Sequence, residues 1–369
     1  MHLYLIYINM KKNIAALLLL SIVPFAGVSG QSLQQYNNHP KKAFFESAEA
    51  RRIGDQVLLW QRETGGWPKN VDMVKPMTDS LRTEVMAQKS RRNDSTTDNG
   101  ATSQQMIFLA YLYQSTGEER YREAFRQGVE YLLSGQYPNG GWPQFWPERR
   151  DYQWHITYND NAMVNTLCLL RDIVSQQPPF EDNLTSGKLR RKAQKAFDKG
   201  IDCIHATQIR VDGRPTIWCQ QHDHKTLLPA PARAYELASY CPVESAELIR
   251  LLMELPKPDK HVRASINGAM AWLEAHKLEG IRVENFVNEE GKYDRRVVQD
   301  EKATPQWARF YDLEEELPFF CDRDGIPRRQ LSEIGYERRT GYSWYNASPS
   351  RLFPLYEKWK QQHGVKNGL

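Results

Sequence analysis

The sequence has no marked excess of charge of either sign, and it has no long hydrophobic run beyond its first thirty residues. The whole chain carries 49 basic side chains, of which only Lys11 and Lys12 precede residue 31, so 47 basic side chains face 45 acidic ones in residues 31–369. A domain that binds nucleic acid is usually strongly basic, so this balance argues against a nucleic-acid partner. It leaves room for an anionic substrate, because a few local arginines can make a positive cleft on a neutral protein. After residue 30, no segment is apolar enough to cross a membrane.

Cysteine is scarce, and the motifs of the common metal sites are missing. The chain has five cysteines and no Cys-x-x-Cys pair, which argues against zinc. It also lacks the Asp-x-Asp-x-Asp-Gly loop of an EF-hand. An odd number of cysteines in an exported protein leaves at least one free thiol. A bridge between Cys203 and Cys219 stays open, but we expect mostly buried free thiols.

Residues 1–30 have the pattern of a secretory signal peptide. Two lysines precede an apolar run over residues 14–26 that is too short to span a bilayer, and small residues follow it. A buried N-terminal helix is the alternative. We therefore expect an exported protein, periplasmic or extracellular, in which residues 31–369 form a single domain and a monomer.

The rest of the chain is dominated by helical periodicity. Apolar residues recur every three to four positions, which is the spacing of one helix face. This pattern predicts helices over residues 104–112, 122–134, 162–174, 190–206, 229–239, 245–253 and 263–276. The alternation typical of strands is scarce, and residues 280–287 are its clearest case.

An internal repeat organises these helices. Gln-Arg-Glu-Thr-Gly-Gly-Trp-Pro at 61–68 recurs as Gln-Tyr-Pro-Asn-Gly-Gly-Trp-Pro at 136–143, and a degenerate copy covers 208–219. Each copy follows a predicted helix and precedes another. A pair of helices of this size cannot bury its apolar face alone, so the units must stack or close into a ring. We expect a mainly α protein, an α/α toroid built as an incomplete barrel of helical hairpins with short strands and long loops. An open α-solenoid is the alternative.

The tryptophans of this repeat have two interpretations. Trp67 and Trp142 either cover the edge of the core beside a Gly/Pro turn or line a cleft and stack on sugar rings, and both can hold together.

Polar clusters open the helices that follow the first two turns. Asp98 and Asp160 sit at matching places in these clusters, each in an Asp-Asn step that leads into an apolar helix. Helix capping explains either aspartate alone. Equivalent helix starts in a toroid lie at one end of the ring, however, so Asp98, Asn99 and Asp160 could converge. A cluster of oxygen ligands suits a hard cation such as calcium.

Three arginines stand out in the second half of the chain. Arg233 lies in a Pro/Ala-rich stretch at the expected start of a helix, where the helix dipole disfavours a cation. An ion pair with Glu236 is its structural interpretation. Arg309 and Arg323 flank aromatic runs, and arginine is the side chain that grips a carboxylate with two hydrogen bonds.

Taken together, these segments resemble the family 10 pectate lyases over nearly all of residues 31–369. The stretches that carry the resemblance are GGWPKN at 65–70, DNGAT at 98–102, GGWPQFWP at 140–147, YNDNAM at 158–163, WCQQHD at 218–223, PAPARAYELAS at 229–239, ARFYDLEEELPFFCDRDGI at 308–326 and GYSWY at 341–345. The resemblance implies an α-helical toroid and a single catalytic domain. It also implies calcium-dependent β-elimination of polygalacturonate, in which the proton on C5 is removed and unsaturated oligogalacturonides are released.

The resemblance also assigns roles to particular residues. Asp160, with Asp98 and Asn99, would hold Ca²⁺, unless Asp98 instead orients a ligand or a substrate hydroxyl. Arg233 would be the base. The remaining residues expected at the substrate are Arg309, Arg323, Asn99, Asn161 and Lys225.

Alternatives remain open for both the base and the reaction. Arginine normally stays protonated, so calcium, Arg309 and Arg323 would have to lower the pKa of Arg233. The fallback bases are Lys225, His222 and His224. One rival function is an inverting toroid glycoside hydrolase with Asp98 and Asp160 as acid and base. The other is a pectin-binding protein without catalysis.

Overall fold

The computed structural model describes residues 31–181 and 183–363, and the expected signal peptide at 1–30 lies outside them. The described chain is mainly helical. Its α-helices are α1 (Gln31–Asn38), α2 (Lys42–Phe45), α3 (Ala48–Trp60), α4 (Asp79–Ala87), α5 (Ser103–Thr116), α6 (Glu119–Gly135), α7 (Ala162–Val174), α8 (Gly187–Thr207), α9 (Pro242–Met253), α10 (Lys260–Ala275), α11 (Tyr336–Gly341) and α12 (Leu352–His363). No helix in these two ranges combines the length and the apolarity needed to span a bilayer.

The strands are short and pair two by two. They are β1 (Ile156–Thr157) with β4 (Gln221–His222), β2 (Arg210–Val211) with β3 (Arg214–Pro215), β5 (Ile281–Val287) with β6 (Tyr293–Gln299), β7 (Trp307–Ala308) with β10 (Tyr345–Asn346), and β8 (Phe320–Cys321) with β9 (Pro327–Arg328). Short 3₁₀ turns are η1 (Asp98–Gly100), η2 (Asp151–Trp154), η3 (Asn159–Asn161), η4 (Leu331–Glu333) and η5 (Ser348–Arg351). The β5–β6 hairpin confirms the strand predicted over 280–287.

The helical periodicity predicted α5 to α10 to within a few residues at most ends, but the helix predicted over 229–239 is wrong. This segment is a loop, in which the N–H of Ala232 donates to Glu236 O (2.9 Å). Pro229 and Pro231 explain the failure, because proline donates no backbone hydrogen bond and disfavours a helical conformation in the residue before it. The apolar residues of this segment belong to a loop that packs on the core, and not to a helix.

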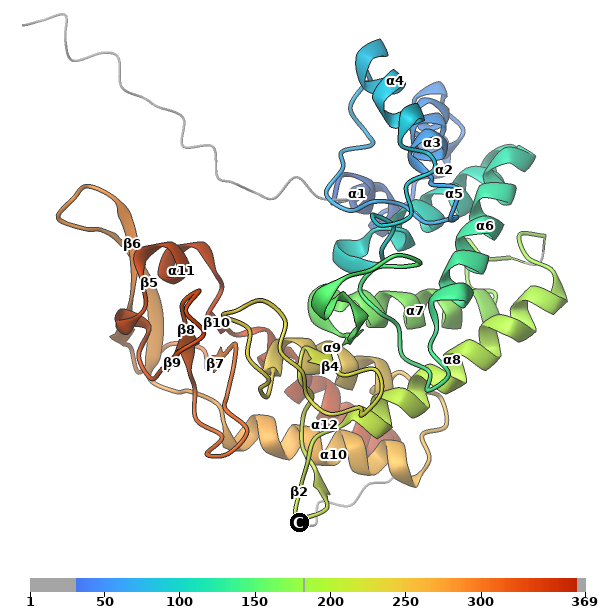
Figure 1. The fold of residues 1–369 in the computed structure, drawn as a ribbon. Coiled ribbons are helices and arrows are strands. Elements are labelled where there is room, and N and C mark those ends of the chain that lie inside the picture. Colours follow the sequence, from blue (N-terminus) through green and yellow to red (C-terminus); the bar gives the residue numbers. More distant parts are fainter. Residues whose placement is uncertain (1–30, 182, 364–369) are drawn as a thin grey trace, which may run out of the picture.

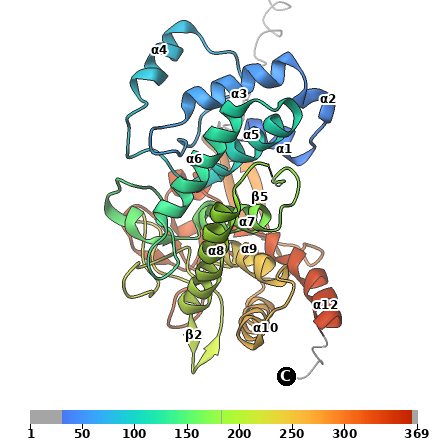
Figure 2. The same ribbon diagram turned by 90° about the vertical axis from the view of Figure 1, so that its right-hand side faces the viewer.

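The helices form two rows around an open ring. Helices α3, α6, α8 and α10 pack side by side in one row, and α5, α7, α9 and α12 pack in the other. The pairs α5–α6, α7–α8 and α9–α10 pack across the rows as hairpins. Figures 1 and 2 both place α3 at one end of this arc and α10 and α12 at the other, so the ring does not close. The architecture is the expected α/α toroid in its incomplete form.

A repeated glutamine joins each unit to the next. Gln61 Nε2 donates to Gly65 O (2.9 Å) in its own turn and to Ala124 O (2.8 Å) in α6. Gln136 repeats this arrangement with its own turn and with α8, and Gln208 repeats it with α10. The amide that opens each sequence repeat therefore ties its own turn to a helix of the next unit.

The repeated tryptophans are part of the core. Trp67, Trp142, Trp218 and Trp307 each donate the indole N–H to a carbonyl of the preceding helix of their unit. Trp67 and Trp142 are 0% and 1% exposed. The interpretation as core plugs is confirmed. The cleft-lining interpretation is wrong for both, because a buried ring has no face left for a sugar.

A smaller second core lies under the loops of the C-terminal half. It consists of Cys219, Tyr235, Cys241, Phe310, Phe319, Phe320, Cys321, Leu331, Ile334 and Trp344. Phe310 directly follows Arg309, Tyr235 lies two residues after Arg233, and Cys321 lies two residues before Arg323. All three arginines therefore flank residues of this core in the chain. All five cysteines are unpaired and four are buried, as expected.

The second glycine turn allows a test of how closely the units pack. Gly140 has a φ of +93°, and a Cβ at this residue would lie 1.9 Å from Lys199 O in α8. We expect Gly140→Ala to lower the free energy of unfolding by roughly 3 kcal/mol or more, from the backbone conformation and the clash together. Gly213→Ala is the matched control, because φ is +76° and no atom lies within 4 Å. It should cost only about 1 kcal/mol. Equal losses in urea unfolding would contradict the close approach.

Candidate active site

The two helix starts that carry the predicted metal ligands are equivalent, but in a different register from the one expected. Thr96 N–H donates to Trp67 O and Thr157 N–H donates to Trp142 O, both at 3.1 Å. These bonds align Asp98 with Asn159, and Asn99 with Asp160. The backbone agrees, because Asn99 and Asp160 share a left-handed conformation with φ of 54° and 50°. The predicted match of Asp98 with Asp160 is therefore one residue out of register.

Despite this shift, Asp98 and Asp160 come together. The turns η1 and η3 pack against each other, and the charge of Asp98 acts on the carboxyl group of Asp160. Asp98 is fully buried, and its Oδ2 accepts hydrogen bonds from Lys69 Nζ and from Gln144 Nε2 (2.7 Å). Its Oδ1 is buried and has no hydrogen-bond partner within the described ranges. An acidic oxygen with no donor, placed beside a second carboxylate, is the arrangement that a cation or a shared proton satisfies.

The environment raises the pKa of Asp160 to about 6. Asp160 is an exposed residue, yet its carboxyl group lies among other protein atoms, and the loss of water around it is the main cause. The negative charge of Asp98 raises the pKa further, and the positive charge of Arg309 acts in the opposite direction. Without a bound cation, two adjacent carboxylates therefore resist full ionisation.

Glu244 is an acidic residue of this site that the sequence analysis missed. Glu244 lies in the first turn of α9, is 4% exposed and accepts a hydrogen bond from Arg309 Nη2 (3.1 Å). The same nitrogen donates to Asn159 Oδ1 (3.1 Å), and Asn159 Nδ2 donates to Asp160 Oδ2 (2.9 Å). Burial raises the pKa of Glu244, and Arg309 opposes this rise. In sequence, Glu244 resembles an ordinary acidic residue at a helix start.

Arg233 is held by an ion pair within its loop. Its Nε donates to Glu236 Oε2 (2.7 Å), its Nη2 donates to Glu236 Oε1, and its backbone N–H also donates to Oε2 (3.2 Å). The proposed Arg233–Glu236 pair is confirmed. The argument from a helix dipole is wrong, because there is no helix here.

The ion pair also decides the pKa of Arg233. Burial acts to lower this pKa, but the hydrogen bonds and the charge of Glu236 outweigh it and hold the pKa above its ordinary value. The carboxylate of Glu236 therefore opposes the lowering of this pKa that calcium, Arg309 and Arg323 were expected to produce. No hydrogen bond within the described part of the chain reaches Nη1 of Arg233. That nitrogen is the one available to a ligand.

Tyr342 connects the arginine loop to the carboxylate pair. Its hydroxyl donates to Glu236 Oε1 (2.6 Å), and its ring lies 4.6 Å from the Arg309 guanidinium and 5.9 Å from that of Arg233. A continuous set of contacts thus runs from Asp160 through Asn159, Arg309, Tyr342 and Glu236 to Arg233. The GYSWY segment contributes this residue, but its role depends on contacts that the sequence does not show.

Arg323 lies on the outer side of the same loop. Arg233, Arg323 and Arg338 surround the ring of Tyr235 at 5.0, 5.9 and 4.6 Å. Arg323 is exposed and pairs with Glu337 (2.7 Å). Exposed ion pairs exchange partners at little cost. Arg323 can therefore turn to a ligand carboxylate, whereas Arg309 is 14% exposed and is anchored on Glu244.

Of the other predicted site residues, two lie next to the carboxylate pair in the chain and the rest lie in or beside β4. Asn99 is exposed and Asn161 is half-buried, and both adjoin the carboxylate pair in left-handed backbone conformations. Lys225 is exposed in the loop that follows β4. His222 is excluded as a fallback base, because it is fully buried, both ring nitrogens bond to backbone groups and burial lowers its pKa to about 4. His224 lies in a different cluster, with His155 and Asp223.

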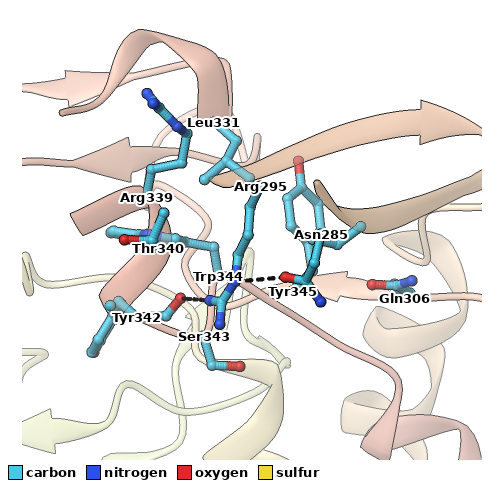
Figure 3. A pocket seen from close by; sticks show the side chains of 12 residues that line it. Asn285, Arg295, Gln306, Leu331, Arg339, Thr340, Tyr342, Ser343, Trp344 and Tyr345 are labelled. Carbon is cyan, nitrogen blue, oxygen red and sulfur yellow. Dashed lines mark hydrogen bonds between the residues drawn. The ribbon is translucent and has the colours of Figure 1, made fainter. Parts of the chain in front are cut away.

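A cavity of about 560 Å³ lies beside Tyr342, under the β5–β6 hairpin (Figure 3). The two arginines of its wall are already paired. Arg295 donates to Tyr342 O (2.9 Å) and to Asn285 Oδ1 (3.3 Å), and Arg339 makes two hydrogen bonds of 2.7 Å to Asp294. This wall therefore supports the position of Tyr342 and the loop that carries it.

The arrangement of Asp98 and Asp160 bears on whether the site could hydrolyse a glycosidic bond with inversion. An inverting hydrolase needs roughly 6.5–9.5 Å between its two carboxyl groups to hold the attacking water. Here the turns η1 and η3, which carry the two aspartates, pack directly against each other. This packing argues against an acid/base pair in an inverting hydrolase.

The raised pKa of Asp160 predicts an unusual effect of mutation on stability. A carboxyl group that holds its proton more tightly in the folded state loses stability as the pH rises from its ordinary 3.8 to about 6. Without calcium, Asp160→Asn should therefore raise Tm by about 1–3 °C at pH 8 and leave it unchanged at pH 4, with solvent screening included. Asp212→Asn is the control, since Asp212 has the same φ of 50° on an exposed turn. A lower Tm for Asp160→Asn at pH 8 would indicate a structural cap.

Comparisons with known proteins place the chain in one family. The family model described as pectic acid lyase matches residues 61–353. Two solved structures of a family 10 polysaccharide lyase from Cellvibrio cellulosa, one of them a mutant in complex with trigalacturonic acid, are each 31% identical to this chain. The mutant complex has a TM-score of 0.75 and the match covers 88% of this chain and 96% of that one. The other structure has a TM-score of 0.74, with coverage of 88% and 95%. No curated protein sequence matches the chain. The helical toroid, the adjacent carboxylates and these matches together show that the chain belongs to the pectic acid lyase family and is a pectate lyase.

Proposed function

We propose that this lyase cleaves polygalacturonate by calcium-dependent β-elimination and releases unsaturated oligogalacturonides. The observation that carries the proposal is the contact between Asp98 and Asp160 beside a band of arginines. A pair of carboxylates in contact suits a cation, and arginines within reach of it suit the carboxylates of the polymer. The Cellvibrio relative in complex with trigalacturonic acid supports the same class of substrate.

The residues present fit a calcium ion. Calcium takes six to eight oxygen ligands in a flexible geometry, and waters or substrate oxygens complete most protein sites. Asp98 Oδ1 is an unpaired buried oxygen, and Asp160 offers a second carboxylate beside it. Asn99 and Asn161 directly follow the two aspartates in the chain, and their amide oxygens are further candidate ligands. Lys69 and Gln144 fix the other oxygen of Asp98, which orients the free one.

The chemistry follows from the acidity of the C5 proton of galacturonate. When bound to the substrate carboxylate, calcium would neutralise it and stabilise the charge that develops as the C5–H bond breaks. The protein has to hold that carboxylate, keep C5 near a proton acceptor and let the C4–O bond break. Water would supply the proton that the departing oxygen takes up. We assign the grip on neighbouring carboxylates to Arg323, with Lys225 at the rim, and the electrostatic support of Asn159 and Asp160 to Arg309.

We assign the proton acceptor to Arg233, at Nη1. Glu236 fixes Nε and Nη2 and so sets the plane of the guanidine group, while Nη1 has no partner within the described part of the chain. The neutral form of Arg233 would take the C5 proton and return it to solvent after the product leaves. Because Glu236 holds the pKa high, this neutral form is rare at neutral pH. The rate should therefore depend strongly on pH.

The proposal extends to the organisation of the chain. We propose that residues 31–369 act as a single catalytic domain and a monomer, and that residues 1–30 direct export, because the substrate is a polymer outside the cell.

The reaction products test the proposal directly. β-Elimination leaves a C4–C5 double bond conjugated with the carboxylate, so the oligogalacturonides absorb ultraviolet light, whereas hydrolysis products do not. We expect absorbance and new reducing ends to rise together when the protein acts on polygalacturonate with calcium. Reducing ends without absorbance would indicate hydrolysis. Binding of the polymer with neither signal would indicate a binding protein.

A further inference from the structure

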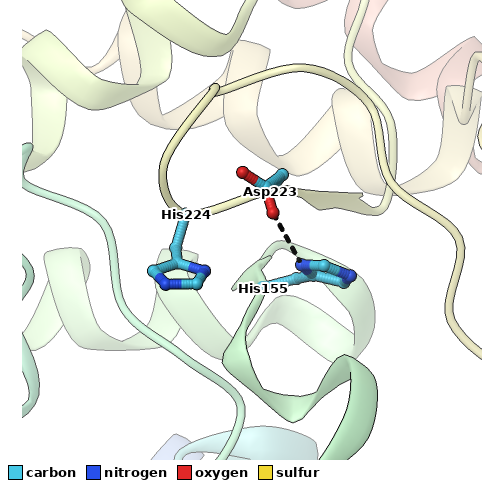
Figure 4. A group of neighbouring side chains, drawn as sticks. All are labelled: His155, Asp223 and His224. Carbon is cyan, nitrogen blue, oxygen red and sulfur yellow. Dashed lines mark ion pairs between the residues drawn. The ribbon is translucent and has the colours of Figure 1, made fainter.

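A second cluster of metal-binding side chains lies beside the strand pair that links the two halves of the site. His155 directly precedes β1, and Asp223 and His224 directly follow β4. The antiparallel register pairs Ile156 with His222, so the chain direction brings His155 opposite Asp223. Figure 4 shows the three side chains facing a common point. The pairing of two segments far apart in sequence therefore builds this cluster.

The atoms of this cluster are close enough to share one ion. A ring nitrogen of each histidine and a carboxylate oxygen of Asp223 all lie within 4.8 Å of one another. His155 Nδ1 is 3.9 Å from Asp223 Oδ2. Tetrahedral zinc with bonds of about 2.0–2.1 Å places its ligand atoms about 3.4 Å apart, so small side-chain movements would close the site. In the described chain, this is the only such group of three.

The nitrogens of both rings point to a missing partner. Nδ1 of His155 and Nδ1 of His224 are both buried and have no hydrogen-bond partner within the described ranges. Buried polar atoms in native proteins almost always have a partner, so two such atoms in one cluster with a carboxylate need an explanation. Burial lowers the pKa of His155, which favours the neutral imidazole that binds metals.

The surroundings hold Asp223 and His224 in place. Asp223 Oδ1 accepts hydrogen bonds from the backbone N–H groups of Lys225 (3.0 Å) and Thr226 (2.8 Å), which leaves Oδ2 for the histidines. The ring of His224 stacks on Tyr137 at 5.1 Å and lies 5.8 Å from Trp154. A fixed carboxylate and a fixed ring are features of built metal sites, where outer contacts orient the ligands.

We propose that His155, Asp223 and His224 bind a divalent transition metal of the zinc class, with water completing the coordination. Two imidazoles and one carboxylate suit Zn²⁺ or Co²⁺ and are a poor set for calcium, which prefers oxygen alone. The absence of Cys-x-x-Cys pairs argued against zinc in the sequence, but it bears only on cysteine sites. The bound metal would tie the segment that leads to Asp160 to the loop that leads to Arg233. Its role would be to position Asp160 and Arg233 relative to each other.

The test is a metal titration of untagged, metal-stripped protein in saturating calcium, which keeps the Asp98–Asp160 site occupied. We expect one Zn²⁺ to bind per chain with a Kd below about 10 µM, and Co²⁺ to give the visible absorption of a low-symmetry site. Asp223→Asn, which keeps the backbone hydrogen bonds to Oδ1, and His224→Ala should each weaken binding by about 100-fold. His276→Ala is the matched control, because His276 pairs with Glu316 (2.7 Å) and has no second histidine in its group.

Two outcomes would overturn the proposal. One is the absence of Zn²⁺ binding at 100 µM, a concentration about tenfold above the expected Kd. The other is equal affinity in the parent, Asp223→Asn and His224→Ala proteins, once circular dichroism shows that all are folded. Neither result would affect the proposed calcium chemistry, because the titration reads metal binding rather than turnover.

Discussion

Replacement of Arg233 with alanine is expected to lower kcat by about 10²- to 10⁴-fold and to leave KM nearly unchanged. The physical reason is that the guanidine nitrogen Nη1 takes the C5 proton only in the transition state, whereas neighbouring arginines bind the substrate in the ground state. The measurement is the initial rate of ultraviolet absorbance on polygalacturonate, with KM and kcat determined separately.

The control for Arg233 is an arginine in a similar local pair. Arg250 bonds to Glu247 on α9 with the same three-residue spacing, but it lies outside the contacts that join Asp160 to Arg233. Arg250→Ala should retain the parent kcat. If Arg233→Ala retains kcat as well, while Lys225→Ala loses it, the proton acceptor is Lys225.

The pH profile of the parent protein gives an independent reading of the same base. Because Glu236 holds the pKa of Arg233 above its ordinary value, the neutral form increases about tenfold for each pH unit throughout the range in which the protein is folded. We therefore expect log(kcat/KM) to rise with a slope near one from neutral to alkaline pH, until another step limits the rate. A plateau that begins near pH 7 would show that a group with a lower pKa takes the proton.

Removal of calcium is expected to abolish activity, with a loss of about 10³-fold or more, and added calcium alone should restore it. An ion on the substrate carboxylate supplies several kcal/mol of charge stabilisation, and each 1.36 kcal/mol corresponds to tenfold in rate. The measurement is the same assay after treatment with a chelator, followed by return of Ca²⁺, Mg²⁺ or Zn²⁺. Mg²⁺ should restore little, because it demands a compact octahedral geometry.

The calcium requirement should also depend on pH in a defined direction. The pKa of Asp160 is raised to about 6, so a proton competes with calcium below that pH. The calcium concentration for half-maximal activity should rise about tenfold per unit as the pH falls below 6. In Asp160→Asn this dependence should weaken, because the competing proton is gone. Full activity of the parent protein in excess chelator would contradict the calcium assignment.

Local sequence patterns predicted the parts of the fold that depend on local physics. The helices α5 to α10 follow from apolar residues spaced along one face, and the repeated Gly-Gly-Trp-Pro turns follow from residues that accept unusual backbone angles. The prediction failed at residues 229–239, because it gave more weight to the apolar periodicity than to the two prolines. The structure shows that the prolines decide the local conformation.

Sequence reasoning identified most residues of the candidate site but not the contacts between them. Asp98, Asp160 and Arg233 were recognised by residue type and by resemblance. Their relations were not, since Asp160 aligns with Asn99 rather than Asp98 and Arg233 is bound by Glu236. The sequence therefore did not show that the hydrogen-bonded carboxylate of Glu236 outweighs burial and holds the pKa of Arg233 above its ordinary value.

The sequence by itself determined that this protein is a helical repeat protein with acidic helix starts and a conspicuous arginine. Only the tertiary structure decided which groups meet. Arg309 reaches Asn159 across 150 residues of chain, and Tyr342 reaches Glu236 across 106. The ligands proposed for the second metal likewise come from two separate segments. The physical reason is that propensity and periodicity act over a few residues, whereas pKa values, ion pairs and metal sites depend on distances in space that only the packed ring sets.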